Sequence, residues 1–307
     1  MTALGLGTVQ LGLPYGNAVQ KPVMLETDAA EILTFAAEQG VLFWDTAAAY
    51  GQSEKRIGGF LRRHPLFQPE ISTKIPAFSP EICADFTSYQ RYAMNSLEAS
   101  FSDLGLKRLA LLQFHQCEVE FLRSKVFAKI TDQLLESGIC AAIGVSVYDV
   151  DQANAALMCP NVSSLQIPVN MVDQRFVTPR QIELYQSRQV RLIARSIFMQ
   201  GVLVDDCPIP PVKKFAELST LRQRSLAAVQ PTGMTLYAAC LSFVLQNLAD
   251  TLSIALIGAD TVSSLASAVE SAGALKGPLD ADIVREFLQI GIEAEATGLL
   301  NPPNWNR

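Results

Sequence analysis

The stretch Asp28-Ala-Ala-Glu-Ile-Leu-Thr-Phe-Ala-Ala-Glu-Gln-Gly40, followed by Val41-Leu-Phe-Trp-Asp45, contains the unit from which most of this 307-residue chain is built. Ile32, Leu33, Phe35 and Ala36 recur with helical spacing, and Gly40 supplies a stop signal, so the pattern predicts a helix over 28–40. The short apolar run that follows predicts a buried strand over 41–45.

The same alternation continues in both directions along the chain. Strands are expected over 3–8, 41–45, 70–75, 109–114, 141–147, 164–169, 190–196 and 253–257. Helices are expected over 28–40, 53–63, 88–104, 126–137, 150–157, 179–188, 236–248 and 262–272. Strands joined by helical crossovers are parallel, and eight such units favour an α/β fold of the (β/α)8 TIM-barrel type, a parallel eight-stranded barrel with outer helices.

An open doubly wound sheet is the alternative. It would carry a G-x-G-x-x-G turn, whereas Gly5-Leu-Gly7-Thr-Val-Gln10 lacks the last glycine. No break in composition marks a linker, so we expect one barrel domain over 1–307. Two segments depart from the cycle: a proline-rich loop insertion over 201–224 and a C-terminal tail over 295–307.

Composition narrows the possible partners. Apolar residues make up 49% of the chain and charged residues 18%, and the formal net charge is −6, so a nucleic-acid partner is not expected. The N-terminal region lacks a cationic start and a spanning apolar run, which predicts a cytoplasmic protein with no membrane partner. Six cysteines without a C-x-x-C pair, beside only two histidines, predict buried free thiols and no metal site. The oligomeric state stays open.

Four polar residues fall where the strands of such a barrel open into its catalytic mouth. Asp45 ends the second strand with Tyr50 in the loop beyond it, Lys74 ends the third strand, and His115 ends the fourth. A lysine ammonium near a phenol lowers the pKa of that phenol, which makes tyrosine a usable proton donor. The cluster therefore suits protonation of a carbonyl oxygen while its carbon accepts hydride from a nicotinamide cofactor.

With Asp45-Thr-Ala-Ala-Ala-Tyr50-Gly51 followed by Ser53-Glu54, and with Lys74 and His115 at later strand ends, the chain resembles an aldo-keto reductase over nearly its whole length. The resemblance implies that Asp45, Tyr50, Lys74 and His115 form the catalytic tetrad, with Tyr50 as general acid. It also implies an NADPH cofactor, with Ser146 and Gln166 holding the nicotinamide carboxamide and Asn170 as a weaker candidate. The remaining residues predicted to bind the cofactor are Thr8, Arg195, Ser196, Gln200, Gly201, Gly258 and Asp260.

The chain departs from the family pattern at three of these places. Val147 follows Ser146 where an asparagine is common, and Arg195 stands where an aromatic residue often stacks on the nicotinamide. A guanidinium in that position disfavours the oxidised, cationic ring. Asp260 follows Gly258 where a basic residue often binds the 2′-phosphate; an acid there suits ribose hydroxyls, so NADH is the alternative cofactor, and a simple helix cap is the alternative role.

The predicted activity is reduction of an aldehyde or ketone, including a sugar-like one, to an alcohol. A small-molecule carbonyl substrate would lie among Leu13, Tyr15, Phe78, Gln116 and the tail around Trp305. Two other functions stay open: a cofactor-binding, catalytically weak regulatory protein, and a lyase or isomerase that uses Lys74 as a Schiff-base nucleophile.

Overall fold

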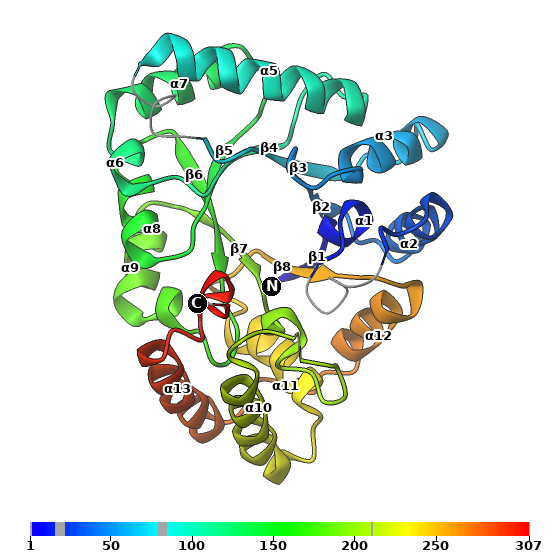
Figure 1. Ribbon diagram of the computed structural model, residues 1–307, viewed down its shortest axis with the longest axis vertical. Coiled ribbons are helices and arrows are strands. Elements are labelled where there is room, and N and C mark those ends of the chain that lie inside the picture. Colours follow the sequence, from blue (N-terminus) through cyan, green and yellow to red (C-terminus); the bar gives the residue numbers. More distant parts are fainter. Residues whose placement is uncertain (1, 16–21, 79–84, 210, 307) are drawn as a thin grey trace.

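A closed barrel of eight parallel strands forms the centre of the computed structural model, which describes residues 2–15, 22–78, 85–209 and 211–306 (Figure 1). The strands follow one another around the barrel in chain order, so the predicted fold class is confirmed. They are β1 (Ala3–Gly7), β2 (Phe43–Asp45), β3 (Glu70–Ile75), β4 (Leu111–His115), β5 (Ile143–Ser146), β6 (Val162–Pro168), β7 (Arg191–Arg195) and β8 (Ile254–Gly258).

Helices surround the barrel on its outside (Figure 1). They are α1 (Val9–Gly12), α2 (Glu26–Glu38), α3 (Ser53–Arg63), α5 (Phe86–Leu104), α6 (Val119–Leu122), α7 (Lys125–Glu136), α8 (Val150–Ala156), α9 (Pro179–Ser187), α10 (Phe215–Val229), α11 (Leu236–Ser242), α12 (Val262–Gly273) and α13 (Ala281–Ala296). Side-chain caps fix several helix starts: Asp85 accepts a hydrogen bond from the Ser88 N–H, and Asp149 and Gln152 form a capping box.

The interior of the barrel changes from apolar to polar along the strands. A small apolar cluster fills the part of the barrel where the strands begin, separate from the main core between sheet and helices. It consists of Phe43, Leu111, Ile193, Ile254 and Leu256. Because residues two apart on a strand share a face, each of three apolar residues is followed on the same face by a polar one. These pairs are Phe43 and Asp45, Leu111 and Gln113, and Ile193 and Arg195. The strand period thus places a polar layer above an apolar one.

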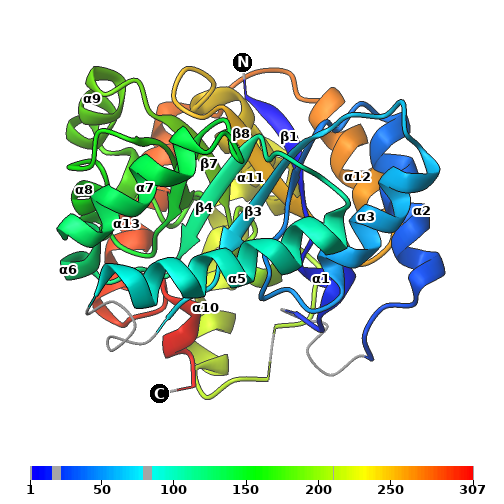
Figure 2. The same ribbon diagram turned by 90° about the horizontal axis from the view of Figure 1, so that it is seen from above.

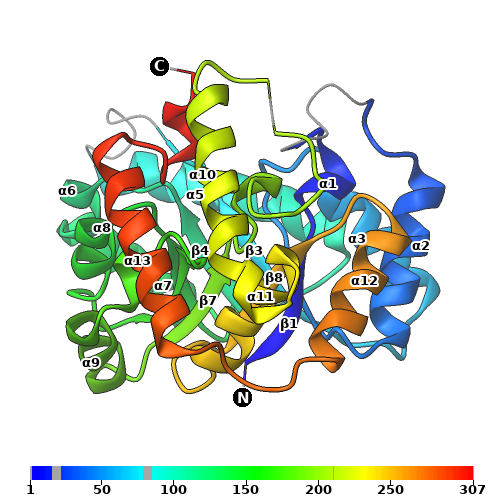
Figure 3. The ribbon, with the colours of Figure 1, turned by 90° about the horizontal axis from the view of Figure 1, so that it is seen from below.

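The two predicted departures from the cycle are more regular than expected. Helix α10 begins at Phe215, inside the predicted insertion, and α13 ends at Ala296, where the predicted tail begins; neither helix was predicted. The two helices pack side by side, joined by an ion pair of Arg224 with Glu293 (Figure 3). Gly291 allows a close approach, since a Cβ there would lie 2.0 Å from the Val172 carbonyl oxygen.

The two chain ends lie at opposite ends of the barrel (Figure 2). The N-terminus lies where the strands begin, and the C-terminal segment lies at the end where they open into their loops (Figures 2 and 3). Trp305 is buried in this segment, and its indole N–H donates to the Leu299 carbonyl. The Trp305 ring is therefore packed inside the protein, and the expectation that the tail around it lines a substrate pocket stays a prediction.

The remaining sequence predictions concern thiols and membrane helices. Cys140, Cys159 and Cys240 are buried free thiols and Cys117 is also buried, whereas Cys207 is only half-buried. Cys83 lies outside the described residues. Among the helices described, none is by itself long and apolar enough to cross a bilayer, although 215–232 and 236–247 pass that test as a pair bent by 78°.

Candidate active site

A buried ion pair lies at the centre of the barrel mouth. The Nζ of Lys74 lies 2.6 Å from Oδ2 of Asp45 and also donates to the carbonyl of Thr46 at 2.8 Å. Lys74 is 1% exposed and Asp45 3%, so both charges have left bulk water. Such a pair persists only when further hydrogen bonds satisfy the charged groups, and the surrounding polar layer supplies them.

Two side-chain amides also donate hydrogen bonds to the Asp45 carboxylate. Gln113 donates to Oδ1 at 3.1 Å and Gln166 donates to the same oxygen at 2.8 Å. Sequence reasoning missed Gln113, although its place on β4, two residues before His115 and on the same face, was the available signal. Gln166 also accepts from Ser146 Oγ at 3.4 Å, so the two residues predicted to hold the carboxamide lie together.

The loop after β2 is held by a chain of hydroxyl groups. Thr46 donates to Ser53, Ser53 donates to Thr8, and Thr8 donates to the backbone carbonyl of Asp45 at 2.9 Å. Thr8 is fully buried and its hydroxyl is engaged on both sides, so its contact with a cofactor stays a prediction. The Ser53-Glu54 part of the motif is structural here: Glu54 is buried and accepts hydrogen bonds from Thr73 and Ser100.

Tyr50 and His115 lie above the ion pair. Their rings meet edge to face with centres 6.1 Å apart, and the Nζ of Lys74 lies 5.0 Å from the centre of the Tyr50 ring. The four side chains predicted to converge therefore lie together at the mouth. Their assignment as a catalytic tetrad is a matter of function and is taken up below.

The acidity of Tyr50 differs from the sequence prediction. Burial raises the pKa of Tyr50 above its ordinary value, the Asp45 carboxylate raises it further, and the Arg195 guanidinium opposes this rise. The prediction of a lowered pKa is therefore wrong for this structure. The physical reason is that Asp45 lies against Lys74 and cancels much of the field of the ammonium, while desolvation penalises the phenolate.

His115 and Lys74 shift in the direction of their neutral forms. Burial lowers the pKa of His115 to about 3, and the positive charges of Lys74 and Arg195 add to the effect. The imidazole is therefore neutral throughout the physiological range. Burial also lowers the pKa of Lys74, while Asp45 opposes this change by charge and hydrogen bond. Since Asp45 lies at 2.6 Å, we assign the pair as carboxylate and ammonium at neutral pH.

Arg195 reaches across one side of the mouth. It ends β7, and its guanidinium donates to the Val147 carbonyl at 2.8 Å and lies 4.3 Å from the centre of the Tyr148 ring. The hydroxyl of Tyr148 in turn accepts from Gln116 at 3.1 Å. We call Gln116, Tyr148 and Arg195 the mouth wall, which extends from the end of β4 to the end of β7.

The loop after β7 is tightly shaped. Ser196, Gln200 and Gly201, all predicted to bind the cofactor, have φ values of 59°, 53° and 86°, and Gln200 donates to the Tyr15 hydroxyl at 3.3 Å. Asn170 supports this loop, because its amide donates to the Ser196 carbonyl at 3.2 Å. Left-handed backbone at residues other than glycine persists only when the surroundings over-determine it, so this loop is a preorganised element.

The end of β8 presents acceptors. A Cβ at Gly258 would lie 2.5 Å from Nε2 of Gln10, so the amide of Gln10 lies directly against this glycine. Oε1 of Gln10 is buried and has no hydrogen-bond partner among the residues that the structure describes. Asp260, two residues after Gly258, is half-buried. The N-cap of α12 is Thr261, whose side chain accepts from the Ser264 N–H at 3.1 Å. Thr261 thus fills the capping role that was the alternative for Asp260.

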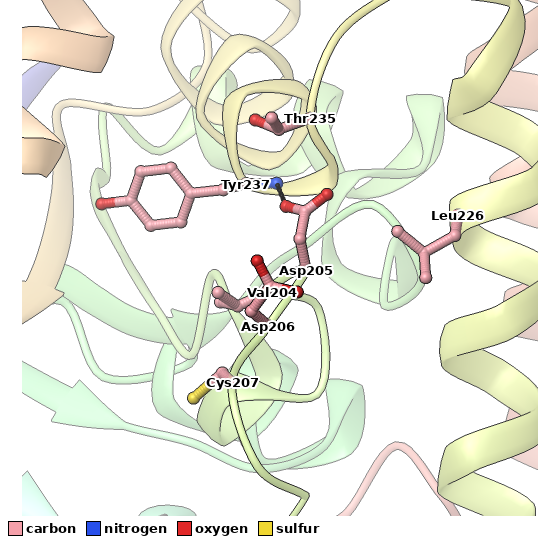
Figure 4. Close-up of a pocket in the computed structure, with 7 residues that line it drawn as sticks. All are labelled: Val204, Asp205, Asp206, Cys207, Leu226, Thr235 and Tyr237. Carbon is pink, nitrogen blue, oxygen red and sulfur yellow. Dashed lines mark hydrogen bonds between the residues drawn. The ribbon is translucent and has the colours of Figure 1, made fainter.

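A hollow of about 740 Å³ lies beside the loop after β7 and contains none of the tetrad residues (Figure 4). Its lining consists of Val204, Asp205, Asp206, Cys207, Leu226, Thr235 and Tyr237. Asp205 accepts from the N–H groups of Leu236 and Tyr237 at 3.0 and 3.1 Å, so its carboxylate supports the start of α11. Figure 4 shows the bond from Tyr237. Among the residues described, no three His, Cys, Asp or Glu side chains gather as a metal site.

Comparison with known proteins shows the family to which the chain is similar. The model of the aldo/keto reductase family matches residues 3–291. An aldo-keto reductase from Gibberella moniliformis is 25% identical over 227 residues, and a D-threo-aldose 1-dehydrogenase from a Pseudomonas species is 25% identical over 238 residues. These alignments cover 71% and 67% of this chain, and 65% and 70% of the respective relatives.

Solved structures show the same fold. The holo form of aldo-keto reductase AKR11C1 from Bacillus halodurans superposes with a TM-score of 0.73 at 21% identity, over 94% of this chain and 91% of that one. Its apo form gives a TM-score of 0.69 at 22% identity, over 94% and 90%. Because the family model spans nearly the whole barrel, including every strand that contributes to the mouth, the chain belongs to the aldo/keto reductase family.

Proposed function

We propose that this protein is an NAD(P)H-dependent oxidoreductase that reduces an aldehyde or ketone to an alcohol. Family membership supports an oxidoreductase that acts on carbonyl compounds. The observation that carries the finer proposal is the convergence of Tyr50, His115 and the buried Asp45–Lys74 pair at one barrel mouth. Tyr50 would be the general acid.

The residues around the mouth fit a nicotinamide dinucleotide. Ser146 and Gln166 present a hydroxyl and an amide beside the tetrad, where a carboxamide requires partners. At the end of β8, the unpaired Oε1 of Gln10 offers an acceptor to a donor such as a ribose hydroxyl. When bound, the reduced cofactor supplies the hydride that side chains cannot provide.

The proton steps follow from the pKa directions. Because the pKa of Tyr50 is raised, its hydroxyl carries the proton throughout the neutral range and is ready to donate it. Neutral His115 can donate an N–H to the same carbonyl oxygen, which fixes the orientation of the substrate. An alkoxide is a stronger base than a phenolate, so transfer from Tyr50 becomes favourable as charge develops on that oxygen.

The structure disfavours Lys74 as a Schiff-base nucleophile. Its Nζ is bound between Asp45 and the Thr46 carbonyl, and the side chain is almost fully buried. A nucleophilic amine must be neutral and reachable, and Lys74 is neither.

The cofactor preference belongs to the same proposal. Acceptors at the end of β8, namely Gln10 Oε1 and the Asp260 carboxylate, suit ribose hydroxyls better than a 2′-phosphate. We therefore keep NADPH as the family expectation and NADH as the alternative that these residues support. Fluorescence titration of the purified protein gives the Kd for NADPH and for NADH and decides between them. If the protein prefers NADH, Asp260→Asn should reduce the difference between the two Kd values.

A panel of aldehydes and ketones, sugar-like ones included, tests the activity itself by the loss of reduced-cofactor absorbance. The Pseudomonas relative is named for action on an aldose, which is why sugar carbonyls belong in the panel. We expect Tyr50→Phe to lower kcat by about a hundredfold or more, as loss of a general acid does, while cofactor binding is retained. Turnover unchanged in Tyr50→Phe would contradict the assignment, and cofactor binding without reduction of any carbonyl would favour the regulatory alternative.

A further inference from the structure

The charges of the mouth do not balance. Asp45 and Lys74 cancel one another at 2.6 Å, while Tyr50 and His115 are neutral at physiological pH. The Arg195 guanidinium carries a positive charge. Among these described residues the charges therefore leave one positive charge in excess, that of Arg195.

Arg195 has no acidic partner within the described part of the chain. The described ion pairs of arginine join Arg175 to Asp173 and Glu295, Arg191 to Glu70, Arg224 to Glu293 and Arg285 to Asp282. The only hydrogen bonds from the Arg195 guanidinium to described residues go to the Val147 carbonyl and, at 3.3 Å, to Ser196 Oγ. Further N–H groups of its planar fork remain unused.

The guanidinium is held in place and not free to seek solvent. It is half-buried, lies against the face of Tyr148 at 4.3 Å and is tied to the end of β5 by the bond to Val147. Tyr148 is itself fixed by Gln116. A guanidinium that is oriented in advance loses little entropy when it binds a partner.

The guanidinium also faces the reacting groups. Its charge lowers the pKa of both Tyr50 and His115, and β7, which carries Arg195, lies across the barrel from β3, which carries Lys74. A substrate whose carbonyl lies against Tyr50 and His115 would therefore place its other substituents toward the mouth wall. A planar fork with free N–H groups is the side chain that binds carboxylate or phosphate in two-point geometry.

We propose that the mouth wall selects carbonyl substrates that also bear an anionic group, a carboxylate or a phosphate, with Arg195 as its binding residue. This inference rests on the proposed carbonyl reduction and names its substrate class. The selection is local: the chain as a whole carries a net charge of −6 and does not attract anions.

Matched substrates test the proposal on the full-length protein. The first pair is 4-carboxybenzaldehyde and 4-carbamoylbenzaldehyde, which differ in charge but little in shape; the second is glyceraldehyde 3-phosphate and glyceraldehyde. The measured quantity is the ratio of kcat/KM for the anionic member to that for the neutral member. We expect a ratio of about tenfold or more for the pair whose anion fits, which identifies carboxylate or phosphate as the group recognised.

Variants then assign the effect to Arg195. The ratio should fall to near one in Arg195→Gln and be partly kept in Arg195→Lys, which retains the charge and loses the planar fork. Arg188→Gln is the matched control, since Arg188 is an exposed arginine after α9 whose loss changes the net charge equally. It should leave the ratio unchanged.

The outcomes separate the two proposals. A ratio at or below one for both pairs in the wild type overturns this inference even if neutral aldehydes are reduced, and so does a high ratio that survives in folded Arg195→Gln. Failure to reduce any carbonyl with either cofactor overturns the proposed function first. A wild-type ratio at or below one refutes the inference without any variant, so the proposal stays falsifiable even if Arg195→Gln does not fold.

Discussion

Replacing His115 by glutamine removes a group whose titration couples folding to pH. The pKa of His115 falls from 6.5 to about 3 on folding, because burial and the nearby charges of Lys74 and Arg195 disfavour the imidazolium. Between those values the unfolded chain binds a proton that the folded chain does not, so acid favours unfolding. The free energy of unfolding is therefore not reduced by this group above pH 6.5, and it decreases as the pH falls from 6.5 toward 3.

The size of the effect follows from linkage. Lowering the pH from 7.5 to 5 should cost about 2 kcal/mol of the free energy of unfolding through this one group, since the unfolded pKa exceeds pH 5 by about 1.5 units. The ring is half-buried, so solvent screening makes this an upper value. His115→Gln cannot take up the proton and should lose stability by that much less over the same interval.

Urea unfolding at pH 7.5 and pH 5, followed by circular dichroism, measures the difference. His64→Gln is the matched control, because His64 is the only other histidine and lies exposed at the end of α3. Its pH dependence should follow that of the wild type. The reasoning is refuted if His115→Gln and the wild type lose the same free energy between the two pH values, since His115 would then titrate normally in the folded protein.

Two further predictions concern stability. Gln113→Leu should lower the free energy of unfolding by about 1–3 kcal/mol in urea, because the Asp45 carboxylate loses a buried hydrogen bond; an unchanged midpoint would show that the bond contributes nothing. Gly291→Ala should destabilise by about 1–3 kcal/mol, since its Cβ would collide with the Val172 carbonyl. Gly273→Ala, with nothing within 4 Å, should raise the melting temperature slightly, and equal effects of the two alanines would contradict the steric argument.

The sequence was sufficient for the barrel and for the convergence of Asp45, Tyr50, Lys74 and His115, because both depend on local patterns. A period of two along β2 and β4 decides which residues enter the barrel, and the chain order of neighbouring strands decides which strand ends meet. Asp45, Lys74 and His115 could thus be placed together before any coordinates were known.

Other features depend on balances that no local pattern contains. Desolvation and the Asp45 carboxylate raise the pKa of Tyr50, and the Arg195 guanidinium lowers it. The balance depends on distances between these groups that no local sequence pattern contains. Helix α10 was hidden by the prolines that precede it, although its buried Leu218 and Leu221 carry helical spacing. The burial of Trp305 likewise depends on a tertiary contact of the last residues.

The mouth wall connects these observations to the chemistry. In the proposed reaction Tyr50 gives up its proton, and a phenolate would then form in a half-buried site whose ammonium is already paired with Asp45. The Arg195 guanidinium acts on the pKa of Tyr50 in the opposite direction to burial, so it favours the phenolate that proton transfer creates. A substrate anion bound to Arg195 would weaken that support. Selection of anionic substrates and acidification of Tyr50 therefore compete for one charge. In Arg195→Gln, a raised KM for the anionic substrate would show that its binding dominates, and a lowered kcat would show that support of the Tyr50 phenolate dominates.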